Sequence, residues 1–368
     1  MKYVDEYRDP IRLQQALADL RRRCSRRWVI MDVCGGQTHG LLRHGIEDAV
    51  SDVLELIHGP GCPVCVTPAE VIGDALHIAR DPRVILATFG DMLRVPGPQG
   101  SLLQLRARGA DVRTMLSPVD AVSWAIQHPD REVVLFAVGF ETTAPATALA
   151  ILQARELGVK NFSVLAHHVR VEPAMRAIAS SPESRIQGFL AAGHVCTVTG
   201  YAGYEQLAQA CRLPVVITGF EPLDLVEGLR ACVESLERRD SSVVNPYARW
   251  ARKEGNPAAR QLIDRVFVTT TLPWRGMGRI IDGGLQLRGD FQDYDARMRF
   301  EVPPASLHCT EDACLSGEVL SGRLKPPECP LFGKACTPAT PLGAPMVSFE
   351  GACAAYFHYG RTSETINA

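Results

Sequence analysis

Short apolar runs rich in Val, Ile and Phe recur along the first 240 residues or so, and amphipathic segments separate most of them. The apolar runs predict β-strands at WVIMDVC (28–34), VLELI (53–57), RVILATFG (83–90), EVVLFAVGF (132–140), NFSVLAHH (161–168), GFLAAG (188–193) and PVVITGF (214–220). The amphipathic segments predict helices at AEVIGDALHIAR (69–80), SLLQLRARG (101–109), APATALAILQARELG (144–158) and YEQLAQACR (204–212). Strands that alternate with helices predict parallel α/β sheets, in which sites lie beyond the carboxyl ends of the strands.

The pattern changes after about residue 240, where Pro, Gly and Cys become dense and the alternation stops. Segments 61–93 and 193–225 can be aligned as a glycine turn, a helix, an apolar strand and an acidic residue, which favours a duplicated α/β unit. We therefore predict the α/β class, with two similar Rossmann-like domains whose parallel sheets flank a cleft. The expected ranges are 28–135 and 136–240 for these domains and 241–368, with an N-terminal helix at 1–27, for a third, irregular domain.

Composition narrows the class of protein. The 368 residues carry a formal net charge of −2, so no basic field indicates a nucleic-acid partner. The chain starts with charged residues and no apolar run is long enough to span a bilayer, so we expect a cytoplasmic protein without a membrane partner. In that reducing compartment, twelve cysteines indicate metal ligands or redox groups, with some inert core thiols, rather than structural disulfides.

The segment MDVCGGQTHG places Cys34 at the end of a predicted strand, five residues before His39. A thiolate and an imidazole there could offer S and N donors to one open metal site. A lone pair of this spacing is more often a buried core cysteine beside a helix-capping Thr38. The Gly-Gly pair favours the metal site, because it adds nothing to a core and suits a tight turn that exposes the sulfur.

The segment HGPGCPVC (58–65) contains Cys62 and Cys65 in a loop stiffened by Pro60 and Pro63. The C-x-x-C spacing allows either a reducible disulfide or a two-thiolate metal clip. A zinc site would need a second cysteine pair nearby, and none follows at zinc-ribbon spacing. The pattern therefore favours a redox-active pair.

The segment VGFETTAPATALAIL places Glu141 between a predicted strand and a helix that Pro145 opens. A carboxylate at a strand end is a candidate acid, base or hydrogen-bond acceptor, although the segment also makes an ordinary helix start. Histidines fall at strand ends as well, and lone histidines are more often structural than ligands. They are His167, His168 and His194.

The strongest chemical pattern is C-terminal, where four cysteines have the spacing C-x14-C-x6-C-x16-C. They are Cys314, Cys329, Cys336 and Cys353. Four thiolates in a Pro/Gly-rich region suit a fold built around a [4Fe–4S] cluster, and a proline follows Cys329 as it often does in ferredoxins. A four-cysteine zinc site is the alternative, but zinc modules usually supply two tight pairs. Cys309 is expected to be a spare thiol.

Taken together, CGGQTH, GPGCPVC, GFETTAP and the C-terminal cysteine spacing resemble the HypD family of hydrogenase maturation factors. The motifs occur in the family's order, and the resemblance covers essentially the whole chain. One position departs, because the family often reads GACMVS where this chain has GAPMVS, with Pro345 in place of a cysteine. That position is not one of the four cluster ligands, so only a role for a fifth cysteine there is in doubt.

The resemblance implies a scaffold for assembly of the Fe(CN)2CO unit of [NiFe]-hydrogenases. In the family, the protein holds iron together with the small chaperone HypC, and cyanide arrives as a thiocyanate on HypE before the unit passes towards the hydrogenase large subunit. Carried over by motif, Cys34 is the iron ligand with His39 nearby, and Cys62 and Cys65 are a redox-active pair. Glu141 lies in the cleft, and the four C-terminal cysteines hold the [4Fe–4S] cluster.

Two other functions fit parts of the pattern. A free-standing [4Fe–4S]-dependent disulfide reductase, resembling ferredoxin–thioredoxin reductase, would use the cluster with Cys62 and Cys65 but would not need Cys34. A structural zinc protein that only binds partners would be colourless.

Overall fold

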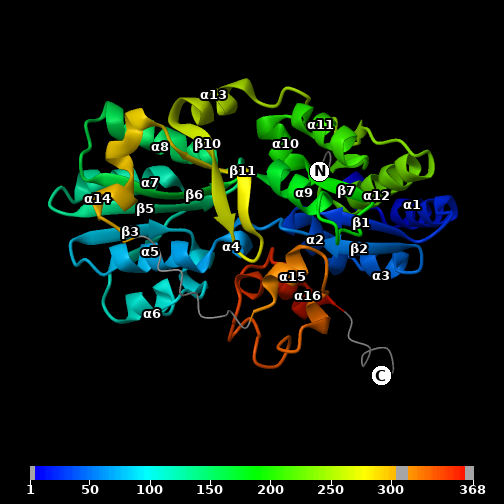
Figure 1. The fold of residues 1–368 in the computed structure, drawn as a ribbon, viewed down its shortest axis with the longest axis horizontal. Coiled ribbons are helices and arrows are strands. Elements are labelled where there is room, and N and C mark those ends of the chain that lie inside the picture. Colours follow the sequence, from blue (N-terminus) through cyan, green and yellow to red (C-terminus); the bar gives the residue numbers. More distant parts are fainter. Residues whose placement is uncertain (1–4, 304–313, 361–368) are drawn as a thin grey trace.

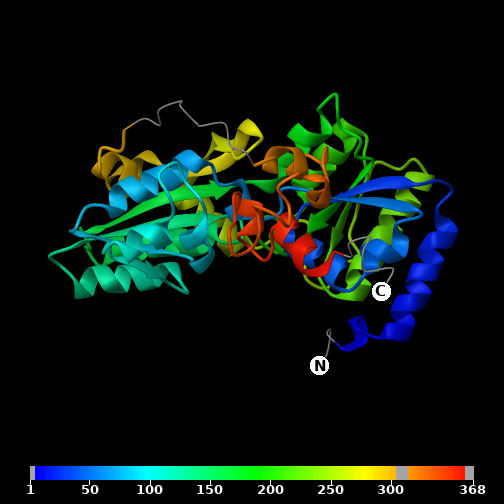
Figure 2. The same cartoon turned by 90° about the horizontal axis from the view of Figure 1, so that it is seen from below.

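The computed structural model describes residues 5–303 and 314–360 of the chain. Within these ranges the strands form two separate sheets at the two ends of an elongated molecule (Figure 1). Residues 314–360, which we call the C-terminal segment, lie against the junction between the two halves (Figure 1, Figure 2). No helix in the described ranges is long and apolar enough to cross a membrane.

The first sheet is parallel throughout and has the strand order β2-β1-β7-β8-β9. Its strands are β1 (Trp28–Asp32), β2 (Leu54–His58), β7 (Gly188–Ala192), β8 (Val215–Thr218) and β9 (Val243–Val244). Every residue of β7 and β8 is buried. Such continuous apolar strands are expected in a parallel sheet, because helices cover both of its faces.

The second sheet is mixed and has the order β10-β11-β6-β5-β3-β4. Its strands are β3 (Val84–Thr88), β4 (Val112–Thr114), β5 (Glu132–Gly139), β6 (Phe162–Val169), β10 (Phe267–Trp274) and β11 (Gly278–Leu287). The first four run parallel, and the antiparallel hairpin β10–β11 joins the β6 edge through Gly284 and Leu285.

Most of the helices pack around the two sheets, and α15 and α16 lie in the C-terminal segment (Figure 1). They are α1 (Pro10–Arg23), α2 (Gly35–Arg43), α3 (Ile46–Val50), α4 (Pro63–Val66), α5 (Ala69–Ala79), α6 (Leu102–Ala107), α7 (Pro118–Gln127), α8 (Ala144–Glu156), α9 (Val171–Ala179), α10 (Gly193–Thr199), α11 (Ala202–Cys211), α12 (Pro222–Glu237), α13 (Pro257–Val266), α14 (Ala296–Arg299), α15 (Ser316–Leu320) and α16 (Ala352–Tyr359). The 3-10 turns are η1 (Asp5–Tyr7), η2 (Gly90–Arg94), η3 (Gly289–Tyr294), η4 (Pro326–Glu328) and η5 (Ala344–Met346).

The C-terminal segment contains little regular structure beyond α15 and α16, as its Pro/Gly-rich sequence predicts. It packs against the two motif helices, α16 on α2 and η5 on α4. Arg94 of η2, which follows β3 of the second sheet, also binds the segment. Its Nη2 donates to the carbonyl oxygen of Val347 at 2.7 Å. The segment therefore lies where the CGGQTH and GPGCPVC motifs begin their helices.

The α/β class and all strands and helices predicted from the apolar pattern are confirmed. The sheets, however, do not follow the expected ranges 28–135 and 136–240, because the chain passes between them after β2, after β6 and after β9. The range 241–303, expected in the irregular domain, supplies β9 to one sheet and the β10–β11 hairpin to the other. A local strand–helix pattern is the same whichever sheet its strand joins, so the sequence alone could not show these crossings.

The structure also differs from the expected place of the N-terminal helix and from the expected duplication. Helix α1 packs along α12 beside the first sheet, rather than with the C-terminal segment. The aligned segments 61–93 and 193–225 do share their order of helices and strand, but β8 joins the same sheet as the preceding β7, whereas β3 joins the other sheet from β2. The resemblance between these segments is therefore local.

Candidate functional site

Two glycine-rich turns meet at the carboxyl ends of β1 and β2. The amide of Gly35 donates to the carbonyl oxygen of Gly61 at 2.9 Å. A Cβ atom on Gly61 would lie 2.3 Å from Cα of Cys34, and one on Gly35 would lie 2.3 Å from the carbonyl oxygen of Glu350. Only glycine fits at either position, because the approaching atoms are backbone. The Cys34 turn, the C-x-x-C loop and the C-terminal segment are thus in direct contact.

Substitution of Gly61 by alanine should therefore be costly. The new Cβ would overlap backbone atoms of Cys34 that cannot rotate away, and we expect a loss of about 1–3 kcal/mol in the free energy of unfolding. Gly73→Ala is the matched control, because its nearest new contact is Pro98 at 3.7 Å in the middle of α5. Urea unfolding measures both variants, and equal stability of the two would contradict the close packing of the turns.

Cys34 ends the first strand and begins α2, and its side chain is only 4% exposed. Burial raises the pKa of its thiol to about 12, so the sulfur is protonated until a metal displaces the proton. The imidazole in contact with it is His194, whose Nδ1 lies 3.8 Å from Sγ. His39, the histidine of the motif, instead packs its ring edge-on against Tyr359 at 4.9 Å.

His194 is the nitrogen ligand candidate beside Cys34, and the sequence did not single it out. It lies on α10, directly after β7, and reaches Cys34 because β7 pairs with β1. Burial lowers the pKa of His194 to about 4, so the ring is neutral and one nitrogen is free to accept or to bind a metal. The only sequence signal was its position at a strand end, which His167 and His168 share.

Cys62 and Cys65 form a compact, buried pair of free thiols. Cys62 caps α4, and its sulfur accepts the amide of Cys65 at 3.3 Å. Burial and the neighbouring Cys62 raise the pKa of Cys65 well above its usual value, and the charge of Cys353 acts in the same direction. Helix α4, which contains Cys65, packs on η5, and η5 in turn packs on α16, which contains Cys353.

The four C-terminal cysteines are gathered in one place. The pKa of the half-buried Cys353 is raised, first by desolvation and then by its neighbours, which are Cys314, Cys336 and Cys329. Among the described residues, no three Cys, His, Asp or Glu side chains converge on a point that could hold a single metal ion. Four thiolates can hold either a [4Fe–4S] cluster, in which each binds a different iron, or a tetrahedral zinc ion. Cys309 lies outside the described residues.

Glu141 follows β5 and is 6% exposed. Its Oε1 accepts the amide of Val171 at 3.0 Å, and its buried Oε2 has no hydrogen-bond partner among the described residues. Burial raises the pKa of Glu141 to about 7, so near neutral pH it can hold or release a proton. Its neighbours Phe140 and Val171 share one apolar cluster with Cys34.

The raised pKa of Glu141 predicts a pH-dependent stability. Between pH 4.5 and about 7 the folded protein binds more protons at Glu141 than the unfolded chain, so stability falls as pH rises through this window. Glu141→Gln removes the effect. We expect the variant to match the wild type near pH 4.5 and to exceed it at pH 8 by up to about 3 kcal/mol.

Chemical unfolding at the two pH values checks this prediction, with Glu172→Gln as the control. Glu172 lies on α9 beside Val171 and pairs with Arg176 at 2.5 Å on a partly exposed surface. An advantage of Glu141→Gln that is the same at both pH values would contradict a buried, neutral carboxyl.

The other two strand-end histidines have structural surroundings. His167 and His168 are buried in β6, and burial lowers their pKa values to about 3 and about 4. His168 shares a hydrogen bond with Thr147 at 3.0 Å.

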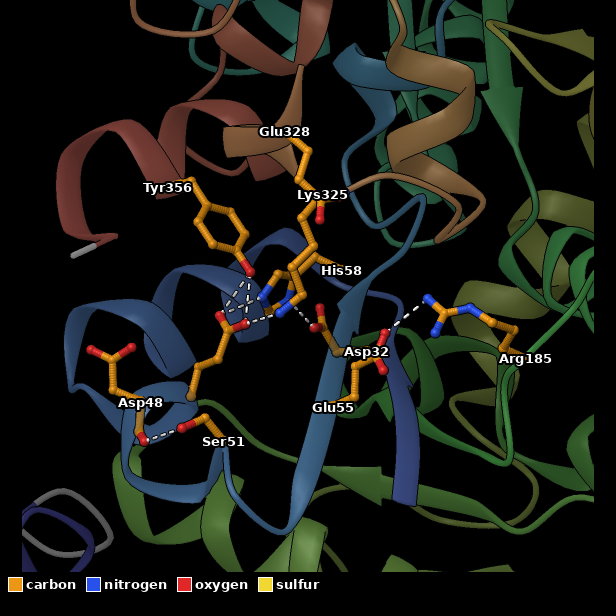
Figure 3. A network of polar contacts seen from close by, with 10 residues as sticks. Asp32, Asp48, Ser51, Glu55, His58, Arg185, Lys325, Glu328 and Tyr356 are labelled. Atoms are coloured by element: carbon orange, nitrogen blue, oxygen red, sulfur yellow. Dashed lines mark hydrogen bonds and ion pairs between the residues drawn. The ribbon is translucent and has the colours of Figure 1, made fainter. Parts of the chain in front are cut away.

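Behind the two turns lies a buried polar network that the sequence analysis missed (Figure 3). His58, the last residue of β2, contacts Asp32 through Nδ1 and Glu47 through Nε2, the latter at 3.2 Å. Burial alone would lower the pKa of His58, but Asp32 and Glu47 raise it to about 10, so the ring is charged. Asp32 also accepts the hydroxyl of Thr38 at 2.7 Å. The network therefore joins the ends of β1 and β2 to the start of α2.

Comparison with known proteins gives one consistent family. A family model described as "HypD: Hydrogenase formation hypA family" matches residues 11–360. Hydrogenase maturation factor HypD of Escherichia coli (strain K12) is 45% identical over 367 residues, which cover 98% of each chain. Hydrogenase expression/formation protein HupD of Azotobacter chroococcum mcd 1 is 45% identical, covering 98% of this chain and 97% of that protein. Hydrogenase maturation factor HypD of Azotobacter vinelandii is 44% identical, covering 100% and 99%.

Proposed function

Because the chain belongs to the HypD family and takes part in hydrogenase maturation, we propose that it is a scaffold and redox protein for assembly of the Fe(CN)2CO centre of [NiFe]-hydrogenases. The observation that carries the proposal is the meeting of three chemically distinct cysteine groups. The turn of Cys34 contacts the C-x-x-C loop at Gly61 and the C-terminal segment at Gly35. Helix α4, which carries Cys65, packs on η5, and η5 packs on α16, which carries Cys353.

The cargo iron would be held by Cys34. A thiolate is a good soft ligand for iron that carries cyanide and CO, and binding would release the proton that burial keeps on the sulfur. His194 could add a nitrogen ligand or orient the thiol, since its Nδ1 lies 3.8 Å away. Two protein ligands leave the iron shell incomplete, so a second protein must supply the rest. The family resemblance identifies that partner as HypC.

The pair Cys62 and Cys65 would supply the electrons for release of cyanide from its thiocyanate carrier, which the resemblance identifies as HypE. Two S–H bonds become one S–S bond, giving two electrons and two protons. The S–CN bond of the carrier breaks, its thiol is restored with one proton, and cyanide leaves with the other before it binds the iron. A hydrogenase large subunit would later receive the completed unit.

The four C-terminal cysteines fit a [4Fe–4S] cluster by number, by softness and by their grouping around Cys353. Such a cluster supplies single electrons, which suits regeneration of the two thiols from a disulfide. The residues that would hold it are Cys314, Cys329, Cys336 and Cys353.

The thiol pair gives the most direct test of the redox part. Cys62→Ser removes one of the two sulfurs but keeps a side chain that can cap α4, so the fold should persist. We expect an unchanged cluster spectrum, unchanged co-purification with HypC and hydrogenase activity reduced to background in cells that depend on this protein. Cys211→Ser, on the outer helix α11, is the control and should retain activity. Loss of the cluster in Cys62→Ser would instead assign the pair a structural role.

A further inference from the structure

All three thiols of the proposed reaction are covered. The exposed fractions of Cys34, Cys62 and Cys65 are 4%, 2% and 0%. Part of the cover is the C-terminal segment, because α16 packs on α2, η5 packs on α4, and Glu350 lies directly against Gly35. A cargo iron that also binds a second protein cannot reach a sulfur in this arrangement. Because the segment packs against the helices that begin at Cys34 and Cys62, its displacement would uncover both turns.

The carboxylate of Glu47 joins the C-terminal segment to the first sheet, whose strands β1 and β2 lead into the CGGQTH and GPGCPVC motifs. Glu47 of α3 accepts the ammonium of Lys325 at 2.8 Å and the hydroxyl of Tyr356 at 2.7 Å, both from the C-terminal segment. Figure 3 shows Tyr356 and Lys325 reaching down towards His58, which Glu47 also contacts. Lys325 is four residues before Cys329, and Tyr356 is three residues after Cys353.

The surroundings make these contacts strong. Glu47 is 8% exposed, and although burial alone would raise its pKa, His58 and Lys325 lower it to about 2, so it is an anion. Hydrogen bonds to a buried charge are stronger than those between neutral groups. The same carboxylate contacts His58, which directly precedes the GPGCPVC loop. His58 in turn contacts Asp32, two residues before Cys34. One side chain thus touches elements that lead to all three cysteine groups.

We propose that Glu47 is a positioning residue that latches the C-terminal segment over Cys34, Cys62 and Cys65, so that the site opens to its cargo only when Lys325 and Tyr356 leave it. Glu47 touches no sulfur and is not a catalytic residue. The proposal rests on the proposed function for the identity of the cargo, but the latch itself can be measured without iron.

Thiol alkylation of the full-length, anaerobically purified protein tests the latch. N-Ethylmaleimide labelling, quantified peptide by peptide by mass spectrometry, gives a rate for each cysteine. Cys232, which lies on the buried face of α12, reports global unfolding in the same sample. In Glu47→Gln we expect the rates of Cys34, Cys62 and Cys65, relative to Cys232, to rise about tenfold, which corresponds to about 1.4 kcal/mol.

Matched variants separate the latch from general damage. Arg323→Met breaks a surface pair with Glu318 in the same segment and a longer, exposed one with Glu183 at 3.5 Å, without touching Glu47. Exposed pairs contribute little, so this control should leave the ratios unchanged. Tyr356→Phe keeps the ring and removes one hydrogen bond, so it should give a smaller rise, and it decides the matter if Glu47→Gln does not fold. The double variant Glu47→Gln/Lys325→Met leaves no unpaired charge at this pair, and should regain thermal stability while keeping the raised ratios.

Unchanged ratios in both Glu47→Gln and Tyr356→Phe would overturn the proposal, as would an equal rise at Cys232. Because labelling needs neither iron nor partners, such a failure would leave the scaffold function intact. Conversely, a failed iron assay would leave the labelling result standing.

Discussion

An alanine at Cys329 should remove the broad brown absorption expected of the proposed [4Fe–4S] cluster and loosen the C-terminal segment, while both sheets stay folded. The segment has only two short α-helices in its described residues, and several of its buried apolar side chains, such as Leu320 and Val347, belong to clusters centred on other parts of the molecule. Its order must come from its contacts with the rest of the molecule and from the ligands that its thiols bind. Where a site supplies the folding energy of a small region, loss of one ligand is loss of that energy.

The measurements are iron and acid-labile sulfide counts, the visible spectrum, and hydrogen exchange of residues 352–359. We expect near-complete loss of sulfide and of amide protection in α16, with protection of β5 and β7 unchanged. Cys211→Ala is the control, because Cys211 is half-buried on the first-sheet side and lies far from the four in sequence. Wild-type protein that carries stoichiometric zinc and no sulfide would rule out the cluster.

Cys34→Ala should abolish maturation completely and leave the cluster, the fold and the thiol pair as they are. Cys34 belongs to a buried apolar cluster, but alanine keeps the Cβ and removes only the sulfur, so we expect the surrounding core to tolerate the change. This variant also separates the scaffold from a free-standing disulfide reductase, which would use Cys62, Cys65 and the cluster alone. Retained maturation in Cys34→Ala would favour the reductase.

His194 and His39 provide a graded comparison within the same site. If Nδ1 of His194 binds the iron or orients the Cys34 thiol, His194→Ala should reduce the iron content of the complex with HypC. His39→Ala should leave the iron content close to the wild-type value. The reason is geometric, because His194 lies 3.8 Å from the sulfur and His39 packs on Tyr359. The reverse order of effects would restore the role that the motif assigns to His39.

Local patterns predicted the strands and helices well, because they depend on neighbours in the sequence. The run EVVLFAVG is buried along nearly its whole length in β5, and Pro145 sits in the first turn of α8 as expected. The hairpin β10–β11 was missed, because its exposed positions, a proline at 273 and several glycines obscure the alternation that marks an edge strand. Sheet membership was missed because it depends on pairing between distant segments.

In the candidate site, too, features set by the local sequence were predicted and features set by distant contacts were missed. The cysteines were found from motifs, since their spacing is local. His194 and Glu47 were not, because their partners lie far away in the sequence, 160 residues for Cys34 and 309 residues for Tyr356. A buried carboxylate such as Glu47 looks in the sequence like an ordinary acid at the start of a helix, and only the packing of the C-terminal segment gives it a role.

Infrared spectroscopy of the anaerobically co-purified complex with HypC tests the central claim most directly, comparing the wild type with Cys34→Ala. Iron-bound cyanide and CO absorb in a region that is free of protein bands, so the cargo is read without interference from the cluster. We predict cyanide and CO bands in the wild-type complex and their absence from Cys34→Ala, with the same sulfide content in both. Undiminished bands in the Cys34→Ala complex would contradict the role of this thiol as the iron ligand.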